Sequence, residues 1–219
     1  MTEKKIKINC RLYFNELCPK DYLRCINASI YKTLTEYDQS LSRQLHDFKG
    51  KKPYRVLGLG DYIRSSYKKI KPAEISFKLE LFDELMEFSE AFHEGLKFDF
   101  QQYRVEFFSH KTEEYQKDPD LREFKLSSPV ICQGNFGNDP RIAILKSILN
   151  LPKDQLKARW IDFYDEFERE VTIQPGAKHL SYYGKIKCFS DIVQEQLDYG
   201  CFRGLGPKTT FGFGELIAR

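Results

Sequence analysis

The sequence predicts an α+β protein made of two tandem ferredoxin-like domains, each with the RRM-like element order βαββαβ. Apolar residues alternate with period two in some segments, and recur every three or four residues in the segments between them, as strands and amphipathic helices require. Residues 111–123 are charged, contain Pro119 and lack a strong apolar period, which is typical of a linker. The predicted domains are therefore residues 1–123 and 124–219.

The first half follows this order closely. Residues 5–14 alternate between an apolar face and a largely basic one, which predicts a half-buried strand. An apolar stripe at positions 23, 26, 30 and 34 predicts a helix to about residue 37, and Ser40 is the expected cap of a shorter second helix. Residues 75–81 predict a strand, a helix follows from about residue 82, and residues 103–107 predict another strand.

The segment between the second helix and the next strand has a different composition. Residues 49–72 hold eight Lys or Arg against one acidic residue, Asp61, with tyrosines and glycines interleaved. Cations that follow phosphates and rings that stack on bases suit single-stranded RNA. A solvated loop or hairpin explains the same composition, and both interpretations stay open.

The second half repeats the plan less clearly. A strand is expected at residues 124–132, with Pro129 at an edge or bulge. Helices are expected to begin at Asp139-Pro140 and at Pro152, the latter on the spacing of Leu156, Trp160, Phe163 and Phe167. Residues 180–189 predict a strand, 191–199 a helix and 211–218 the final strand.

Composition limits the class of protein. The net charge is only +3, so a nucleic-acid footprint must be a local patch. The six cysteines include no CxxC pair and the four histidines lie far apart, so we expect neither a zinc site, nor another metal or cofactor, nor a disulfide framework. The N-terminus lacks the pattern of a signal peptide and no apolar run is long enough to span a bilayer, which predicts a soluble cytoplasmic protein without membrane contact.

The C-terminal glycine-rich stretch, residues 204–214, is the main functional signal. Two GxG pairs frame Lys208, Thr209 and Thr210, and glycines allow several backbone N–H groups to point at one anion. The stretch is neither a Walker loop nor a dinucleotide fingerprint. It therefore predicts a phosphate contact with a polymer that crosses a surface, although a hairpin turn with glycines for geometry also fits.

The stretch GLGPKTTFGFG is similar to the C-terminal glycine-rich loop of the CRISPR-associated endoribonucleases of the RAMP superfamily, which cut precursor crRNA. The segments NASIYKTL, FKLSSPVIC and KIKCFSDIVQEQLDYGCFRGLG resemble other parts of that family, so the resemblance covers nearly the whole chain. It implies two tandem ferredoxin-like domains and a metal-independent endoribonuclease that cleaves CRISPR repeat RNA to 2′,3′-cyclic phosphate and 5′-hydroxyl ends.

The resemblance also implies catalytic residues. Some members cut with a tyrosine, a histidine fifteen positions on and a lysine six further, and these spacings give Tyr31, His46 and Lys52, with Lys49 or Lys51 as substitutes for the lysine. The chemistry is suitable, because a histidine with a pKa near about 6.5 can accept or donate a proton at neutral pH.

Further candidates and alternatives remain open. His179 is a reserve for the histidine, and Asp162, Asp165, Glu166, Glu168 and Glu170, on one face of the expected helix, are a less favoured Mg²⁺ site. A non-cutting RNA-binding scaffold of the same superfamily and a nucleotide-binding regulator are the alternative functions. The sequence does not decide whether the chain forms a homodimer or joins a CRISPR effector complex. The predicted RNA contacts are Lys49, Lys51, Arg55, Arg64, Lys68, Lys69, Arg203, Gly204, Gly206, Lys208, Thr209, Gly212 and Gly214.

Overall fold

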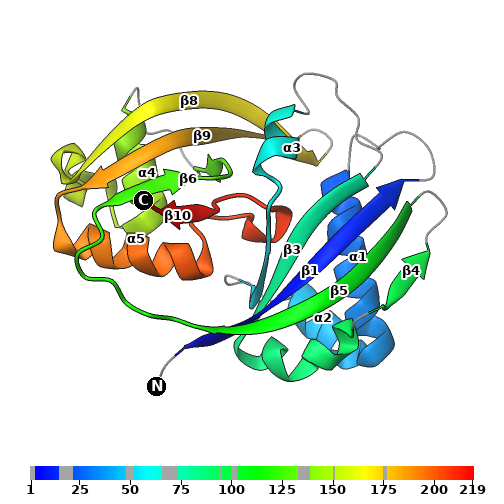
Figure 1. Ribbon diagram of the computed structural model, residues 1–219. Helices are drawn as coiled ribbons and strands as arrows, with labels where there is room; N and C mark the ends of the chain where they lie inside the picture. Colours follow the sequence, from blue (N-terminus) through cyan, green and yellow to red (C-terminus); the bar gives the residue numbers. More distant parts are fainter. Residues whose placement is uncertain are drawn as a thin grey trace. The chain divides into compact units, whose positions relative to one another are not determined.

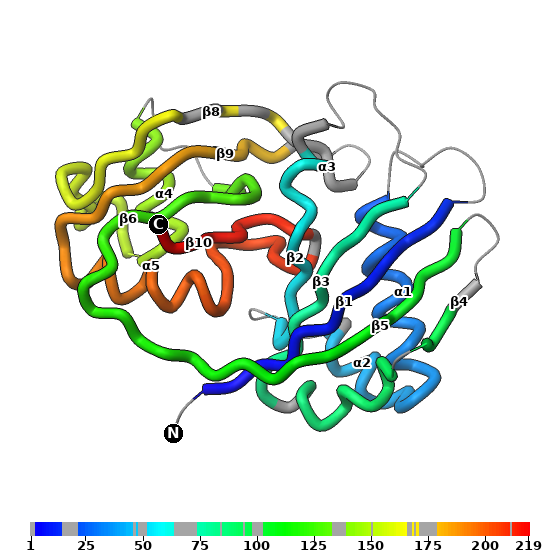
Figure 2. The backbone as a smooth tube through the Cα atoms, in the orientation of Figure 1, coloured from blue at the N-terminus to red at the C-terminus, as the bar shows by residue number. Residues whose placement is uncertain are grey.

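The chain folds into two compact units, Met1–Glu114 and Tyr115–Arg219, and each is described by itself (Figure 1). The computed structural model describes residues 3–14, 22–47, 52–65, 74–93, 95–99, 103–132, 139–149, 151–174 and 177–219, most of which are coloured in Figure 2. Within the described residues, no helix is both long enough and apolar enough to cross a membrane.

The first unit is a ferredoxin-like sheet with its two longest α-helices on one face, as the sequence predicts (Figure 1). Its strand order is β2-β3-β1-β5-β4, and every pairing is antiparallel. The short strand β4 was not expected from the sequence. The elements are β1 (Lys4–Phe14), α1 (Tyr22–Tyr37), α2 (Gln39–Asp47), β2 (Tyr54–Leu57), α3 (Gly60–Ser65), β3 (Glu74–Phe82), the 3₁₀ helix η2 (Asp83–Phe92), β4 (Lys97–Asp99) and β5 (Tyr103–Glu114).

The core of the first unit lies between this sheet and α1. The apolar face of β1 is buried at all five predicted positions, and the helical stripe of α1 supplies Ile26, Ile30 and Leu34. The helix expected from residue 82 is a 3₁₀ helix that ends at Phe92. Helix α2 starts earlier than predicted, because Asp38 and not Ser40 caps it: the Asp38 carboxylate accepts the backbone N–H of Ser40 at 2.8 Å.

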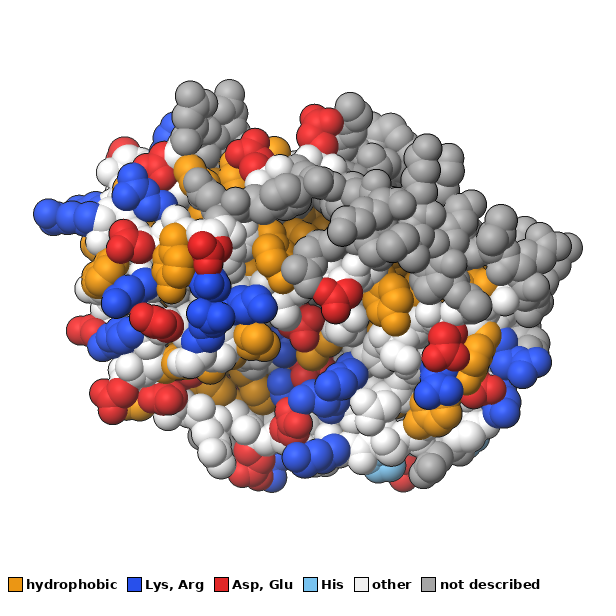
Figure 3. Space-filling model, turned by 45° about the horizontal axis from the view of Figure 1, so that its top comes forward, with side chains coloured by type: hydrophobic (Ala, Val, Ile, Leu, Met, Phe, Trp, Pro, Cys, Tyr) orange, Lys and Arg blue, Asp and Glu red, His pale blue; other side chains and the backbone are white. Residues whose placement is uncertain are grey.

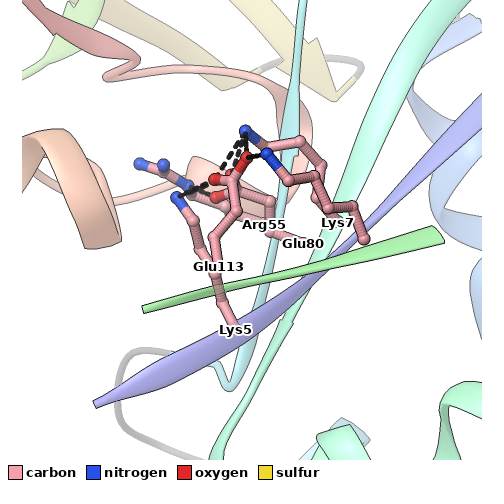
Figure 4. A network of polar contacts seen from close by, with 6 residues as sticks. Lys5, Lys7, Arg55, Glu80 and Glu113 are labelled. Carbon is pink, nitrogen blue, oxygen red and sulfur yellow. Dashed lines mark hydrogen bonds and ion pairs between the residues drawn. The ribbon is translucent and has the colours of Figure 1, made fainter. Parts of the chain in front are cut away.

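Three cations share one buried carboxylate on the other face of the sheet (Figure 4). Glu80 in β3 is fully buried and pairs with Arg55 in β2 and with the Nζ of Lys5 in β1, the latter at 2.8 Å. Lys7 lies 3.7 Å from Glu80 and donates to both carboxylate oxygens of Glu113 at 2.8 Å. Burial lowers the pKa of Lys5, although Glu80 opposes that effect. The basic face predicted for β1 is therefore neutralised at its N-terminal end.

The second unit is also ferredoxin-like. Strands β6 and β7 both pair with β9 and act as one interrupted strand, which gives the order β10-β6/β7-β9-β8. Helices α4 and α5 contact each other and cover the core of this sheet. The elements are β6 (Glu123–Leu126), β7 (Val130–Ile131), α4 (Pro140–Leu149), η3 (Lys153–Gln155), η4 (Ala158–Trp160), β8 (Ile161–Gln174), β9 (Ala177–Cys188), α5 (Asp191–Arg203), η5 (Thr209–Phe211) and β10 (Leu216–Ala218).

The helix predicted from Pro152 is wrong. Only two short 3₁₀ turns form there, and β8 pairs along its length with β9 in a long hairpin. Apolar residues of this segment also occur at alternate positions, as in Ile161 and Phe163, so both periods were present and strand pairing decided between them. The acidic residues proposed as a Mg²⁺ site therefore lie on a strand and do not form one helix face.

Two further predictions in the second half need correction. The segment 124–132 is divided at Pro129 into β6 and β7, and the final strand begins at Leu216 and not at residue 211.

The predicted linker is also shorter, because β5 continues to Glu114. Tyr115 then donates to the Asp198 carboxylate at 2.6 Å, which ties the start of the connection to α5. The pKa of Tyr115 is raised mainly by burial and, second, by its hydrogen bond to the Asp198 carboxylate.

The charge cluster predicts a large cost for removing its shared anion. Glu80→Gln would leave Lys5 and Arg55 buried without their counter-charge, and we expect it to lower the free energy of unfolding by about 3 kcal/mol. The matched control is Glu114→Gln, which breaks an exposed pair with Lys4 and should cost less than about 1 kcal/mol. Urea unfolding of both variants measures the difference, and similar costs would contradict the role given to Glu80.

Candidate active site

Tyr31 is held at a fixed orientation on α1. Its ring meets the ring of Tyr54 edge to face, with centroids 6.3 Å apart and planes at 85°. Tyr54 is itself buried at the start of β2, where its hydroxyl donates to the side-chain oxygen of Asn27 at 3.0 Å. Packing and a buried hydrogen bond therefore fix the support against which Tyr31 lies.

Lys52 and Tyr31 meet at the C-terminal end of α2. The Lys52 Nζ donates to the Tyr31 hydroxyl at 2.9 Å and to the backbone carbonyl of Leu45. The Tyr31 hydroxyl also donates to that carbonyl, at 3.5 Å. The ammonium lies 5.6 Å from the Tyr31 ring centroid, which fits its hydrogen bond at the hydroxyl end of the ring better than a position over the ring face.

His46 follows Leu45 directly, so the peptide that accepts the Lys52 hydrogen bond is the one that joins Leu45 to His46. The backbone of His46 belongs to α2, and its side chain lies outside the described part of the structure. The structure thus brings two predicted catalytic side chains to the backbone of the third. Their catalytic role stays a prediction.

The Leu45 carbonyl had no signal in the sequence, because every residue has this group and only the tertiary contact distinguishes it. Helix α2 is positioned by its cap and by contacts with α1. Thr35 donates to the hydroxyl of Ser42 at 2.7 Å, and Leu41 and Leu45 are buried. Hydrogen bonds from Ser40 lower the pKa of Asp38, so the cap is present above the ordinary pKa of an aspartate and is lost as pH falls through the lowered value.

The basic segment 49–72 is only partly described. Lys49, Lys51, Lys68 and Lys69 lie outside the described residues, and Arg64 is described only as part of the backbone of α3. Arg55 is 3% exposed and ion-paired with Glu80, which is a structural role. The prediction that Arg55 contacts RNA therefore disagrees with its burial, since contact would require breaking that pair. Part of the expected loop is strand β2 and helix α3.

The glycine-rich stretch, residues 204–214, closes on itself by backbone hydrogen bonds. The N–H of Leu205 donates to the carbonyl of Gly214 at 2.8 Å, and that of Gly212 donates to Thr209 at 3.1 Å. The N–H of Gly214 donates to Pro129 at 2.7 Å, which ties the stretch to the break between β6 and β7. These N–H groups are therefore used within the second unit and are not directed at a ligand.

Backbone geometry explains why the stretch needs glycine. Gly204, Gly206, Gly212 and Gly214 all have φ between 66° and 81°. Lys208 also has a positive φ, 67°, which is uncommon for a residue with a side chain. The turn interpretation of the glycines accounts for these positions. Two cationic side chains lie here, Lys208 within the stretch and Arg203 at the end of α5. Both are half-buried.

Comparison with known proteins gives one consistent result. No family model and no curated protein matches the sequence. Among solved structures, Cas6 from Thermus thermophilus matches with a TM-score of 0.63 at 13% identity, covering 99% of both chains. A RAMP protein described as binding different RNA substrates matches at 0.60 and 14% identity, covering 98% of this chain and 99% of its own. The product of a Cas6-related gene from Pyrococcus furiosus matches at 0.60 and 15%, covering 99% and 98%.

This chain has the fold of the Cas6 and RAMP structures. The matches span nearly all of each chain, so the likeness includes both ferredoxin-like units and the short connection between them. It confirms the fold class expected from the sequence.

Charges are interspersed on the face drawn in Figure 3, where Lys and Arg side chains lie beside Asp and Glu among the described residues. This agrees with the small net charge.

Within the described residues, no three His, Cys, Asp or Glu side chains come together as a set of metal ligands. His179, the reserve candidate, is half-buried on β9.

The geometry of the glycine-rich stretch predicts which glycine is irreplaceable. A Cβ at Gly214 would overlap the carbonyl oxygen of Leu205, whereas a Cβ at Gly95, with a similar φ of 80°, meets nothing within 4 Å. Gly95→Ala should cost about 1 kcal/mol of stability for its backbone conformation alone. Gly214→Ala should cost at least about 3 kcal/mol, because strain and overlap add. Thermal unfolding distinguishes the two variants, and equal shifts would contradict this account.

Proposed function

We propose that this chain is a metal-independent endoribonuclease that cleaves CRISPR repeat RNA in precursor crRNA, leaving 2′,3′-cyclic phosphate and 5′-hydroxyl ends. The observation that supports it most directly is the meeting of the Tyr31 hydroxyl and the Lys52 ammonium at the peptide before His46. The likeness to Cas6 structures, one of which is a product complex, adds support for RNA as the substrate class.

His46 is the proposed proton-transfer group. Cleavage needs the 2′-oxygen to attack the adjacent phosphorus while the bond from phosphorus to the 5′-oxygen breaks. One proton leaves the 2′-hydroxyl and one is delivered to the 5′-oxygen, so the transesterification consumes no water. His46 directly follows Leu45, whose carbonyl accepts a hydrogen bond from Lys52, and a histidine is suited to one of these transfers at neutral pH.

Lys52 is the proposed stabiliser of phosphorane charge. Its ammonium has three N–H groups, and two are directed at Tyr31 and Leu45, which fixes the direction of the third. A cation fixed before the substrate arrives stabilises developing charge without reorganisation. Tyr31 accepts a hydrogen bond from Lys52, and its own proton makes only a long hydrogen bond of 3.5 Å to the Leu45 carbonyl. Exchanging that long bond for one to the substrate would let Tyr31 orient the attacking 2′-hydroxyl.

The glycine-rich stretch has a narrower proposed role than a backbone anion nest. Several of its N–H groups are already bonded within the second unit, and it follows the C-terminus of α5, where the helix dipole disfavours anions. Contact with the RNA backbone is therefore assigned to the side chains of Lys208 and Arg203. The glycines provide the turn that presents Lys208.

Incubation of end-labelled repeat RNA with the protein in excess EDTA tests the reaction. We expect one cut, lost when a 2′-deoxynucleotide stands 5′ of the cut and reduced roughly 10²–10⁴-fold in His46→Ala, because the nucleophile or the proton transfer is removed. End analysis should find a cyclic phosphate. A cut that requires Mg²⁺ would contradict the mechanism, and tight binding of the cognate repeat without a cut would favour a non-cutting RAMP scaffold.

Substitutions at the other two side chains test the site itself. Lys52→Ala should lower the single-turnover cleavage rate about 10²–10³-fold, and Tyr31→Phe should lower it less, since it removes only the orienting hydroxyl. Lys32→Ala is the matched control, because it removes one exposed cation from α1 next to Tyr31. Melting temperatures show whether each variant folds. Folded variants that all cleave at the wild-type rate would remove these residues from the site.

A further inference from the structure

A pocket of about 250 Å³ lies on the face of the first unit's sheet opposite the apolar core. Its walls include the side chains of Asn9 and Arg11 from β1, Ser76 and Lys78 from β3, and Phe108 from β5. Asn9, Ser76 and Lys78 are exposed, and the Cys10 between the two β1 residues is buried on the core face. The volume is below the roughly 300–1,000 Å³ typical of drug-sized ligands and suits one small planar group.

Strand geometry creates this pocket. Asn9 is opposite Lys78 and Arg11 is opposite Ser76, so four side chains of two neighbouring strands share one face. The pairing of β1 with β5 shifts register between Ile8 and Cys10, a bulge that lies beside Phe108. Strand β2 ends at Leu57, and Gly58, which also lines the pocket, has no side chain to fill it.

The walls combine two flat surfaces with polar groups. The Arg11 guanidinium carbon lies 5.0 Å from the centre of the Phe108 ring, and the guanidinium donates to the hydroxyl of Tyr13 at 2.9 Å. Its contact with Glu74, 3.8 Å away, is exposed and weak. Lys78 forms no ion pair with the described residues and provides an uncompensated positive charge.

We propose that this pocket binds one nucleotide of single-stranded RNA, with the base against the Phe108 and Arg11 surfaces and the phosphate near Lys78. Proteins hold unpaired bases by stacking them on aromatic rings and guanidinium planes, and RRM domains do so on the face of a sheet. The Asn9 amide nitrogen donates to the Ser109 hydroxyl at 3.0 Å, so the Asn9 side-chain oxygen and the Ser76 hydroxyl are the groups proposed for a base edge. The choice of RNA rests on the proposed function, and the pocket is a second contact separate from Tyr31, His46 and Lys52.

Fluorescence anisotropy with a fluorescein-labelled oligoadenylate of about ten nucleotides tests the pocket in the full chain. Phe108→Leu keeps an apolar side chain and removes the ring, and should weaken binding about tenfold or more. Tyr37→Leu, which changes an exposed aromatic residue of the first unit outside the pocket, is its control and should bind as the wild type does. Melting temperatures of both variants report folding.

A salt series tests the cation. Lys78→Ala should lower the slope of log affinity against log salt concentration by about 0.7, the value for one phosphate contact with a single strand. Lys111→Ala removes the same charge from an exposed position of β5, outside the pocket, and should leave the slope unchanged. Equal effects of Lys78→Ala and Lys111→Ala would overturn the assignment of Lys78.

Two outcomes overturn the proposal and leave the proposed nuclease activity untouched. Folded Phe108→Leu that binds the oligonucleotide as tightly as the Tyr37→Leu control does would reject the proposal. Free AMP that displaces the labelled strand as effectively as unlabelled oligoadenylate does would assign the pocket to a free mononucleotide. With repeat cleavage intact, either outcome would reject the pocket alone, whereas a wild-type chain that binds no RNA at all would reject the proposed function.

Discussion

The first unit depends on neutralising the charge of its central strand. Strand β1 lies between β3 and β5 and carries Lys5 and Lys7 towards the face away from the core. These lysines can occupy the middle of a sheet because Glu80 and Glu113 stand on the two neighbouring strands. Without these carboxylates, desolvated cations would repel one another within the same sheet.

This neutralisation also separates structural cations from those proposed to contact RNA. Lys5 and Arg55 belong to the buried cluster, whereas Lys52 and Lys78 lie outside it. Counting basic residues along the chain does not make this distinction, because Arg55 and Lys52 stand three residues apart and have opposite environments. The position of a carboxylate on a neighbouring strand decides which role each residue has.

The Tyr31 and Lys52 contact arises from the order of elements in the first unit. Helix α1 carries Tyr31, the next helix ends near Leu45, and the chain returns to the sheet at β2 just after Lys52. Tyr54, in β2, packs against the Tyr31 ring and so connects the start of that strand to the site. Helix α2 packs against α1, so the Leu45 carbonyl lies within reach of both the Tyr31 hydroxyl and the Lys52 ammonium.

The sequence by itself determined the elements whose period was unambiguous: β1, α1, β3 and α4 were all expected close to their observed positions, since burial on one face dictates their spacing. Together with the glycine-rich stretch, these elements were enough to predict the fold class. The spacing of Tyr31, His46 and Lys52, taken from a family resemblance, indicated where to look for a site.

Tertiary structure decided what local pattern could not. It selected strand over helix at β8 through pairing with β9, and it committed Arg55 to Glu80. It also used the glycine N–H groups for a turn and formed a pocket from Arg11 and Phe108, which are far apart in the chain and adjacent only in the sheet.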